Sequence, residues 1–391
     1  MRTLLNKIIF YLKSKLTILI YFLIINISKY SSRNKIKILN EVLPFQPSLP
    51  RNIDDIKEGL RNNFNKKNTF KSKYIFLLES YYVSYYGVVF KNFRLFIPSL
   101  VHPKWNVQVI SSLRTNIVSF LLQQWRSNVI KIDNDEQNPV AIVYELWSAS
   151  NYYHWICDSL PRLLLLKKRY QSCTILLPSP VPEYVKLTVS WFGFDNVVEI
   201  NKECIYSIKF IVIPELTAGV AAQNELMMKQ VRSLLMDKYN TTRCMELVLT
   251  QQKSRFYSSR KSAKFRKITN ESEVIKLLQK YDFSVIDFDE YSFLGQIQIM
   301  SKADFLIGVH GANLTNMMFM KDEAKIIEIM NQEFFNPCYY HLSSSLNMEY
   351  NYLAGQPNNK GIDDNNDNLF VELSILEELV IKNTQQLKLE I

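Results

Sequence analysis

Short apolar runs alternate with amphipathic stretches along most of the chain after residue 71. Apolar runs bounded by turn-forming residues predict strands, and apolar residues that recur every three or four positions predict helices. In the first half, the predicted strands are residues 73–80, 139–147, 173–179, 196–200 and 208–214, and the predicted helices are residues 151–170 and 182–193. This alternation favours a mostly parallel sheet covered by helices.

The alternation begins again after a predicted helical connector at residues 224–239. The second set comprises predicted strands at residues 255–259, 283–288, 304–309 and 325–330, and predicted helices at residues 271–281, 292–303 and 314–320. A polar stretch, residues 356–368, precedes a last amphipathic helix at residues 371–389. Two such halves predict an α/β protein that binds its ligand in a cleft at the carboxyl ends of the strands.

The first 40 residues follow a different pattern. Apolar side chains recur there at helical spacing and run almost without interruption from Leu16 to Ile27. This run is shorter than the roughly 20 residues that cross a bilayer. We therefore predict a basic, apolar helix over residues 1–40 that lies in an anionic membrane leaflet, with a single span or a soluble docking helix as alternatives. Residues 41–70 are rich in Pro, Asn and Lys and are predicted to be a linker.

The formal net charge of +10 is concentrated at the N-terminus, where residues 1–40 hold eight basic side chains and no acidic one. The remainder of the chain is almost neutral, which argues against a nucleic-acid partner. The five cysteines are widely spaced and form no CxxC pair, a pattern typical of reduced thiols in a cytoplasmic protein. With the N-terminal helix, this predicts a location on the cytoplasmic face of a membrane, either peripheral or through one N-terminal anchor.

A histidine lies where a predicted strand turns into a predicted helix, in the sequence GVHGAN at residues 308–313. Gly308 and Gly311 allow the backbone to approach a ligand, and the free N–H groups at the start of a helix favour an anion. His310 could donate to a phosphate there or act as an acid or base. The alternative is a structural turn histidine.

A basic run at residues 253–267 precedes this turn and contains seven Lys or Arg residues and no acid. Such runs are usually solvated surface. Arg260, however, closes a predicted strand at the same edge of the sheet, where a guanidinium can bind a diphosphate through two hydrogen bonds.

The first half has its own group of polar side chains. Asn151, His154 and Asp158 are spaced three and four residues apart, so a helix places them on one face, and Arg162 extends the stripe. The functional interpretation is a general base assisted by a carboxylate. The alternative is an ordinary polar helix face. Neighbouring aromatic residues such as Trp155 could stack on a sugar ring or lie in the core.

Two Asp-x-Asp triplets, at residues 133–135 and 287–289, raise the possibility of a metal site. Neither has the additional His or carboxylate ligands of a dedicated site. The chain also contains no P-loop, GxSxG or HExxH motif. We therefore expect no metal and no cofactor.

In this order, the motifs resemble those of glycosyltransferase family 61, of the bacterial type associated with capsular or surface polysaccharide biosynthesis. The resemblance rests on NYYHWICDSLPRLLLL at residues 151–166, FYSSRKSAKFRKITNESEV at residues 256–274, EYSFLGQIQIMSKADFLIGVHGANLTNMMFM at residues 290–320 and KIIEIM at residues 325–330. It covers residues 144–331. The common pattern has Gly after His-Gly-Ala, where this chain has Asn313.

The resemblance implies a nucleotide-sugar donor and an inverting transfer to a glycan or lipid-linked glycan acceptor. Residues at the donor would be Arg260, Arg266, Asn270, Ser292, Gln296, His310, Gly311, Ala312, Asn313 and Glu328. Residues on the acceptor side would be His154 and Asp158 as catalytic groups, with Asn151, Trp155 and Arg162. Spacing leaves open whether His154, Asp158 or His310 is the base.

The expected fold class is α/β and GT-B-like, with two Rossmann-type doubly wound domains facing a cleft and an N-terminal apolar helix. The expected domains are the membrane-associating helix 1–40, the linker 41–70, an acceptor domain 71–235, a nucleotide-sugar domain 240–350, and a polar linker with a C-terminal helix at 351–391. Two other functions remain open. One is a metal-dependent transferase that uses Asp287 and Asp289, and the other is a non-catalytic nucleotide- or glycan-binding partner of a polysaccharide assembly.

Overall fold

The computed structural model describes residues 35–40, 42–91, 94–99, 128–148, 150–219, 221–242, 253–358 and 366–385. These residues form two compact units. The first unit contains residues 71–217 together with the strand at residues 35–39, and the second contains residues 42–70 and the chain from residue 218 onward. Each unit is described by itself below.

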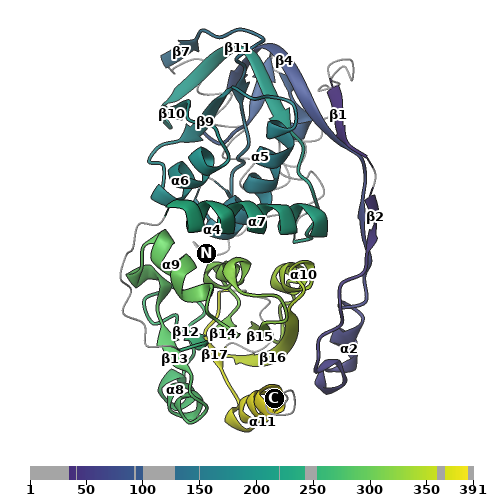
Figure 1. The fold of residues 1–391 in the computed structure, drawn as a ribbon, viewed down its shortest axis with the longest axis vertical. Helices are drawn as coiled ribbons and strands as arrows, with labels where there is room; N and C mark the ends of the chain where they lie inside the picture. Colours follow the sequence, from purple (N-terminus) through teal and green to yellow (C-terminus); the bar gives the residue numbers. More distant parts are fainter. Residues whose placement is uncertain are drawn as a thin grey trace, which may run out of the picture. The chain divides into compact units, whose positions relative to one another are not determined.

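The first unit is built on a mixed sheet with the strand order β10-β9-β8-β11-β4-β5-β6, to which β1 and β7 add (Figure 1). Its strands are β1 (Lys35–Leu39), β4 (Lys73–Val83), β5 (Val89–Lys91), β6 (Arg94–Leu95), β7 (Asn128–Ile132), β8 (Val140–Ala141), β9 (Thr174–Pro178), β10 (Val197–Ile200) and β11 (Cys204–Pro214). The pairs from β10 to β11 are parallel, and β4 runs antiparallel to β11. The sheet therefore has a parallel half, as predicted, and an antiparallel half.

The helices of the first unit follow the predicted segments closely. They are η3 (Ile97–Ser99), α4 (Tyr152–His154), η4 (Trp155–Ser159), α5 (Leu160–Lys167) and α6 (Glu183–Trp191). The predicted helix at residues 151–170 is thus one continuous rod of α4, η4 and α5, in which η4 is a π-helical turn. Leu163, Leu165 and Leu166 of α5 are completely buried, which anchors the rod in the core of this unit.

The second unit has a doubly wound sheet with the strand order β13-β12-β14-β15-β16-β17. Its strands are β12 (Arg255–Ser258), β13 (Ser284–Ile286), β14 (Phe305–Val309), β15 (Lys325–Asn331), β16 (Glu349–Pro357) and β17 (Leu369–Phe370). All neighbours are parallel except β16 and β17. The order of the strands along the chain reverses between β12 and β14, and ligands of doubly wound sheets bind at such a switch point.

Helices cover both faces of this sheet (Figure 1). The elements are α7 (Glu225–Thr242), α8 (Glu271–Gln279), η5 (Phe288–Glu290), α9 (Phe293–Met300), η6 (Ala312–Phe319), α10 (Cys338–Ser345) and α11 (Leu373–Gln385). Helices α8 and α11 pack together, and α9 and α10 each pack against η6. Phe305, Ile307 and Val309 of β14 face the core beneath α8 and α11, so the alternate positions face the layer that contains η6.

The segment predicted as a linker at residues 41–70 has structure of its own within the second unit. It contains β2 (Val42–Phe45), η2 (Ile53–Asp55), α2 (Glu58–Arg61) and β3 (Asn68–Phe70). Asn52 exchanges two hydrogen bonds with the backbone of Tyr352 in β16. Phe64 is completely buried and packs edge-on against the rings of Phe335 and Tyr340. The segment is therefore attached to the second sheet by a specific anchor.

Most of the predicted membrane helix, residues 1–34, lies outside the described residues. Its end, Lys35–Leu39, forms the strand β1 and pairs with β4. Among the helices in the described parts of the chain, none has the length and apolar character that a membrane span requires. The predicted α/β class with parallel sheets is confirmed, and the N-terminal apolar helix is not supported.

Phe64 tests the attachment of the 42–70 segment. We expect Phe64→Ala to lower the free energy of unfolding by about 3–5 kcal/mol, because it removes a buried aromatic side chain and leaves a cavity. Leu49→Ala in the same segment is the control. Leu49 is 48% exposed, so its loss should change stability by no more than about 0.5 kcal/mol. Urea denaturation of both variants measures this difference, and equal effects would contradict the anchor.

Candidate functional site

The first group of candidate side chains lies at the start of the rod in the first unit. Asn151 is the N-cap of α4, and its side-chain oxygen accepts hydrogen bonds from the backbone N–H groups of Tyr153 and His154. The His154 ring nitrogen Nδ1 lies 2.6 Å from Asp158 Oδ2. Asp158 belongs to the π-helical turn η4. Turns of this kind are frequent at functional sites, since the extra residue re-aims side chains.

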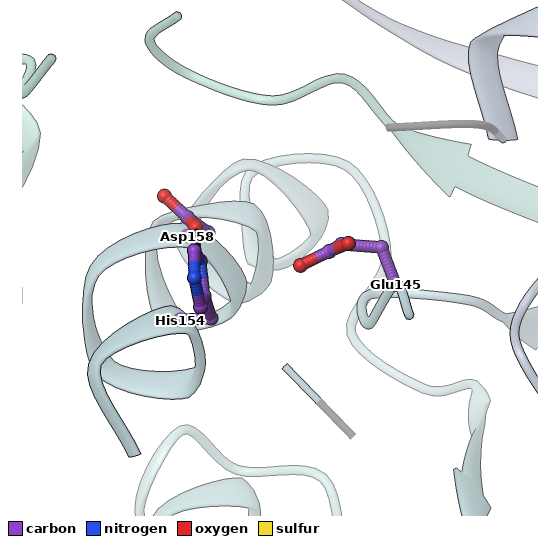
Figure 2. A group of neighbouring side chains, drawn as sticks. All are labelled: Glu145, His154 and Asp158. Atoms are coloured by element: carbon purple, nitrogen blue, oxygen red, sulfur yellow. Dashed lines mark hydrogen bonds and ion pairs between the residues drawn. The ribbon is translucent and has the colours of Figure 1, made fainter. Parts of the chain in front are cut away.

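Glu145 completes this group, although sequence reasoning did not find it. It follows β8 in a turn whose amides hold its carboxylate: Trp147 N–H donates to Oε2 at 3.1 Å and Ser148 N–H to Oε1 at 3.1 Å. Figure 2 shows the carboxylate pointing toward the helix that carries His154 and Asp158. The sequence pattern placed Glu145 inside the predicted strand at residues 139–147, whereas β8 ends at Ala141 and Glu145 lies beyond it.

The three side chains influence one another electrostatically. Burial raises the pKa of Glu145 above its ordinary value, and the charge of Asp158 adds to this effect. Burial by itself lowers the pKa of His154. The hydrogen bond to Asp158 and the charges of Asp158 and Glu145 outweigh this, so the pKa of His154 is raised. His154 is therefore a stronger base than a free imidazole.

Two residues expected on the acceptor side lie inside the unit, and we revise their assignment. Trp155 is 1% exposed, and its indole N–H donates to the Thr188 hydroxyl at 2.9 Å. Arg162 is buried, and its guanidinium donates to the carbonyl oxygens of Ile142, Val143, Tyr144 and Pro214. Both side chains lie on the side of the helix that packs against the core of the unit. Their polar atoms are hydrogen-bonded within the framework of the first unit.

Within the described residues, one group of side chains could hold a metal ion, namely Glu145, His154 and Asp158, with ligand atoms within 4.8 Å of one another. His154 Nδ1 and one Asp158 oxygen are already joined by a short hydrogen bond. This pairing is typical of an acid–base group. The carboxylate of Asp287, proposed for a metal from the sequence, instead caps Asp289 N–H and is hydrogen-bonded to Ser262.

The second group of side chains lies at the switch point of the sheet in the second unit. Arg260 follows the carboxyl end of β12, and His310 follows that of the neighbouring strand β14. Gly311 comes next, and a Cβ atom at this position would overlap the Arg260 guanidinium. Arg266 has a positive φ of 60° and donates from NH1 to the His310 carbonyl at 2.8 Å. A left-handed backbone at a non-glycine residue is a strain often found at functional sites.

The two arginines are close enough to repel each other. Burial lowers the pKa of Arg260, and the charge of Arg266 lowers it further. Burial also lowers the pKa of Arg266. The Arg266 Nε atom is buried and has no hydrogen-bond partner among the described residues. Among the residues that the structure describes, no carboxylate is hydrogen-bonded to either of these half-buried guanidinium groups, so an anion would stabilise the pair.

A buried chain of hydrogen bonds fixes His310. Its Nδ1 lies 2.5 Å from Glu328 Oε1, and the Tyr350 hydroxyl donates to Glu328 Oε2 at 2.6 Å. Glu328 is completely buried. Because Glu328 accepts from Nδ1, the other ring nitrogen, Nε2, is left for a ligand. Sequence reasoning missed Tyr350, since it lies in β16, a strand that was not predicted.

Three expected donor residues hold the scaffold around this site. Asn270 exchanges two hydrogen bonds with the backbone of Val371. Ser292 caps α9 by accepting from Gly295 N–H at 3.1 Å. Gln296 donates to the carbonyl oxygens of Phe288 and Tyr291 and accepts from Asn316 Nδ2 at 2.9 Å. Ala312 and Asn313 begin η6 and are half-buried.

Comparisons with known proteins indicate the class of protein that part of the chain resembles. Residues 152–327 match the family model described as Glycosyltransferase 61. The EGF domain-specific O-linked N-acetylglucosamine transferase of Mus musculus is 28% identical over 222 residues, which are 51% of this chain and 42% of that protein. The protein of the same name from Drosophila melanogaster is 35% identical over 103 residues, 26% of this chain and 20% of that protein. The chain spans less than half the length of these curated relatives.

The match identifies residues 152–327 as similar to a family of glycosyltransferases. This matched range is less than half of the 391-residue chain. The matched range contains His154 and Asp158 in the first unit and Arg260, Arg266 and His310 in the second. Glu145, Glu328 and Tyr350 lie outside it.

The predicted location on the cytoplasmic face of a membrane is wrong. The relatives are named for EGF domains, which are disulfide-dense modules of secreted proteins. The described residues also contain no helix that could span a membrane. The prediction rested on apolar residues 16–27, which lie outside the described parts of the chain, and on cysteine spacing, which does not report a compartment by itself.

Gly311 tests the anion site directly. We expect Gly311→Ala to weaken the binding of inorganic pyrophosphate by roughly tenfold to a hundredfold in Kd, because the added methyl group displaces the Arg260 guanidinium and one charge-assisted hydrogen bond is lost. The backbone of Gly311 is extended, with φ 171°, so alanine fits it without strain. Gly219→Ala is the control, since a Cβ atom there meets nothing within 4 Å. Calorimetric titration with an unchanged Kd for Gly311→Ala would contradict the site.

Proposed function

We propose that the protein is an inverting glycosyltransferase that moves a sugar from a nucleotide-sugar donor to an acceptor hydroxyl. The observation that carries this proposal is the group of Arg260, Arg266 and His310 at the switch point of a doubly wound sheet. The departing nucleoside diphosphate carries charge that such groups stabilise. The similarity of residues 152–327 to a family of glycosyltransferases supports the same reaction.

The diphosphate would be bound by the two guanidinium groups, by His310 Nε2 and by the first backbone N–H groups of η6. A helix dipole contributes only about 0.3–1 kcal/mol at an exposed site. The arginines therefore supply most of the stabilisation. Gly311 supports this binding because it leaves room for the Arg260 side chain.

The acceptor would be activated by His154, with Asp158 orienting its ring. Asp158 occupies Nδ1, so Nε2 is the nitrogen that takes the proton from the acceptor hydroxyl. We assign the base to His154 in this proposal, because His310 is hydrogen-bonded to a completely buried carboxylate in the second unit. The proposed fold class is GT-B-like, with the acceptor-side groups assigned to the first unit and the donor-side groups to the second.

The relatives' names indicate the sugar and the linkage to test first. They are O-linked N-acetylglucosamine transferases specific for EGF domains. We propose N-acetylglucosamine as the transferred sugar and a hydroxyl group as the acceptor, either on a protein domain or on a glycan. We further propose that the reaction needs no metal ion, since the guanidinium groups can neutralise the leaving diphosphate.

Arg260→Ala tests the donor site by its kinetics. Turnover should fall by roughly 10²–10³-fold, as for the loss of one donor that stabilises transition-state charge, while the protein stays folded. Lys261→Ala is the matched control, because Lys261 is an adjacent, exposed cation whose ammonium group forms an ion pair with the exposed Glu290. Steady-state transfer from nucleotide-activated N-acetylglucosamine measures both variants. Wild-type kinetics for Arg260→Ala would remove this residue from the donor site.

Chelation tests the metal-free mechanism. With excess EDTA, we expect the rate of sugar transfer to stay unchanged, because protein cations perform the role of a metal. Assays with and without added Mg²⁺ or Mn²⁺ make the comparison. A rate that disappears with EDTA and returns with either ion would favour a metal-dependent transferase instead.

A further inference from the structure

Glu145 is a buried acid to which the proposed reaction assigns no role. It is 4% exposed, in the turn between β8 and α4. Both of its carboxylate oxygens accept backbone N–H groups of its own turn, and Ser148 Oγ donates to the Glu145 carbonyl. These bonds fix the direction of the carboxylate. They leave lone pairs free, because each oxygen can accept a second hydrogen bond.

The carboxylate faces the His154–Asp158 pair (Figure 2). Arg162 is a buried cation whose charge interacts with Glu145, but it directs its donors to four backbone carbonyl groups and makes no ion pair with Glu145. The imidazole of His154 is therefore the group that can match the charge of Glu145 at short range. It is approached by one carboxylate from its own helix and by another from the β8 turn.

We propose that Glu145 is a positioning residue of the sugar transfer, which acts through His154 by stabilising the imidazolium that forms when the acceptor is deprotonated. This inference rests on the proposed function. In the reaction, the acceptor proton moves to His154 Nε2 and the acceptor oxygen forms a bond to the anomeric carbon. The bond from that carbon to the diphosphate breaks, and the diphosphate leaves with the electron pair.

The charges around His154 make this assignment specific. Asp158 faces the ring from its own helix and Glu145 from the β8 turn, and the charge of Arg162 in α5 interacts with these two carboxylates. The Trp147 ring also lies 5.2 Å from the imidazole, centroid to centroid. With both acids ionised and Arg162 charged, the group carries a net negative charge while His154 is neutral. Uptake of the acceptor proton neutralises it, so both carboxylates favour the protonated product of the base step.

The test follows the titration of His154 by NMR in the full-length protein. The chain contains four histidines, so selective labelling gives few signals, and His154→Gln identifies the one required. In Glu145→Gln the pKa of His154 should be lower than in the wild type. Glu215→Gln is the control. Glu215 is a half-buried carboxylate in the same unit that interacts electrostatically with Lys73 and Arg162, and His154 is not among the groups that shift its pKa. An unchanged His154 pKa in a folded Glu145→Gln protein would overturn the proposal.

Kinetics provide the second readout. In Glu145→Gln, the acidic limb of kcat/KM against pH should move to lower pH, and turnover should fall about tenfold, less than the roughly 10²–10⁴-fold that a whole general base contributes. Glu145→Asp should restore part of the rate, because it keeps the charge. A lower rate without any shift of the pH profile would indicate a purely structural role and overturn the proposal.

Three further outcomes also decide between the alternatives. If Glu145→Gln does not fold, the wild-type titration still decides, because the His154 signal must show an inflection where the labelled Glu145 carboxyl titrates. Its absence would overturn the inference. If the pKa of His154 falls in Glu145→Gln but the wild type transfers no sugar, the electrostatic coupling stands and the proposed function fails. A His154 signal that shifts with Zn²⁺ only when Glu145 is present would instead identify a metal site and overturn the inference.

Discussion

The hydrogen bond between a histidine and a carboxylate is the interaction on which both candidate sites depend. In the first unit it joins His154 to Asp158, and in the second it joins His310 to Glu328. Each bond fixes one ring nitrogen and leaves the other for chemistry. The charged groups around each histidine then give the two histidines different roles. His154 lies among acids that raise its basicity, whereas His310 lies beside two guanidinium groups that favour a bound anion.

The parallel sheet of the second unit brings the donor groups together. Parallel strands end at the same edge, so Arg260 and His310 meet because β12 and β14 are neighbours. The two glycines near His310 are required by close packing. Gly308 leaves space for Leu314 of η6, and Gly311 leaves space for the Arg260 guanidinium. The order of the parallel strands, the two glycines and the half-buried arginines therefore form this candidate donor site together.

Much of the fold was predictable because hydrophobic periodicity reports local structure directly. The helix at residues 151–170 and the strand at residues 304–309 both formed where the pattern indicated, and His154 with Asp158 followed from helical spacing. The 42–70 segment was missed because its polar composition resembles a linker, whereas a single buried ring, Phe64, attaches it to the second unit.

The remaining parts of the sites depend on contacts between distant segments. Glu145 is one of 37 acids in the chain, and only the fold shows that its carboxylate faces His154. The Tyr350 hydroxyl donates a hydrogen bond to Glu328 on the neighbouring strand, and the two residues are 22 positions apart in the sequence. Trp155 and Gln296 occupy suggestive positions in the motifs, but their polar atoms are engaged within the framework. Residue spacing cannot report such partners, because it contains no tertiary information.

The central claim is that one histidine serves the acceptor and the other serves the donor. The most direct measurement is calorimetric titration of His154→Ala and His310→Ala with nucleoside diphosphates, with sugar transfer assayed on the same samples. The account predicts that His154→Ala binds the nucleotide as the wild type does but transfers little sugar, and that His310→Ala loses nucleotide affinity. Equal loss of nucleotide binding in both variants, or wild-type transfer by His154→Ala, would contradict it.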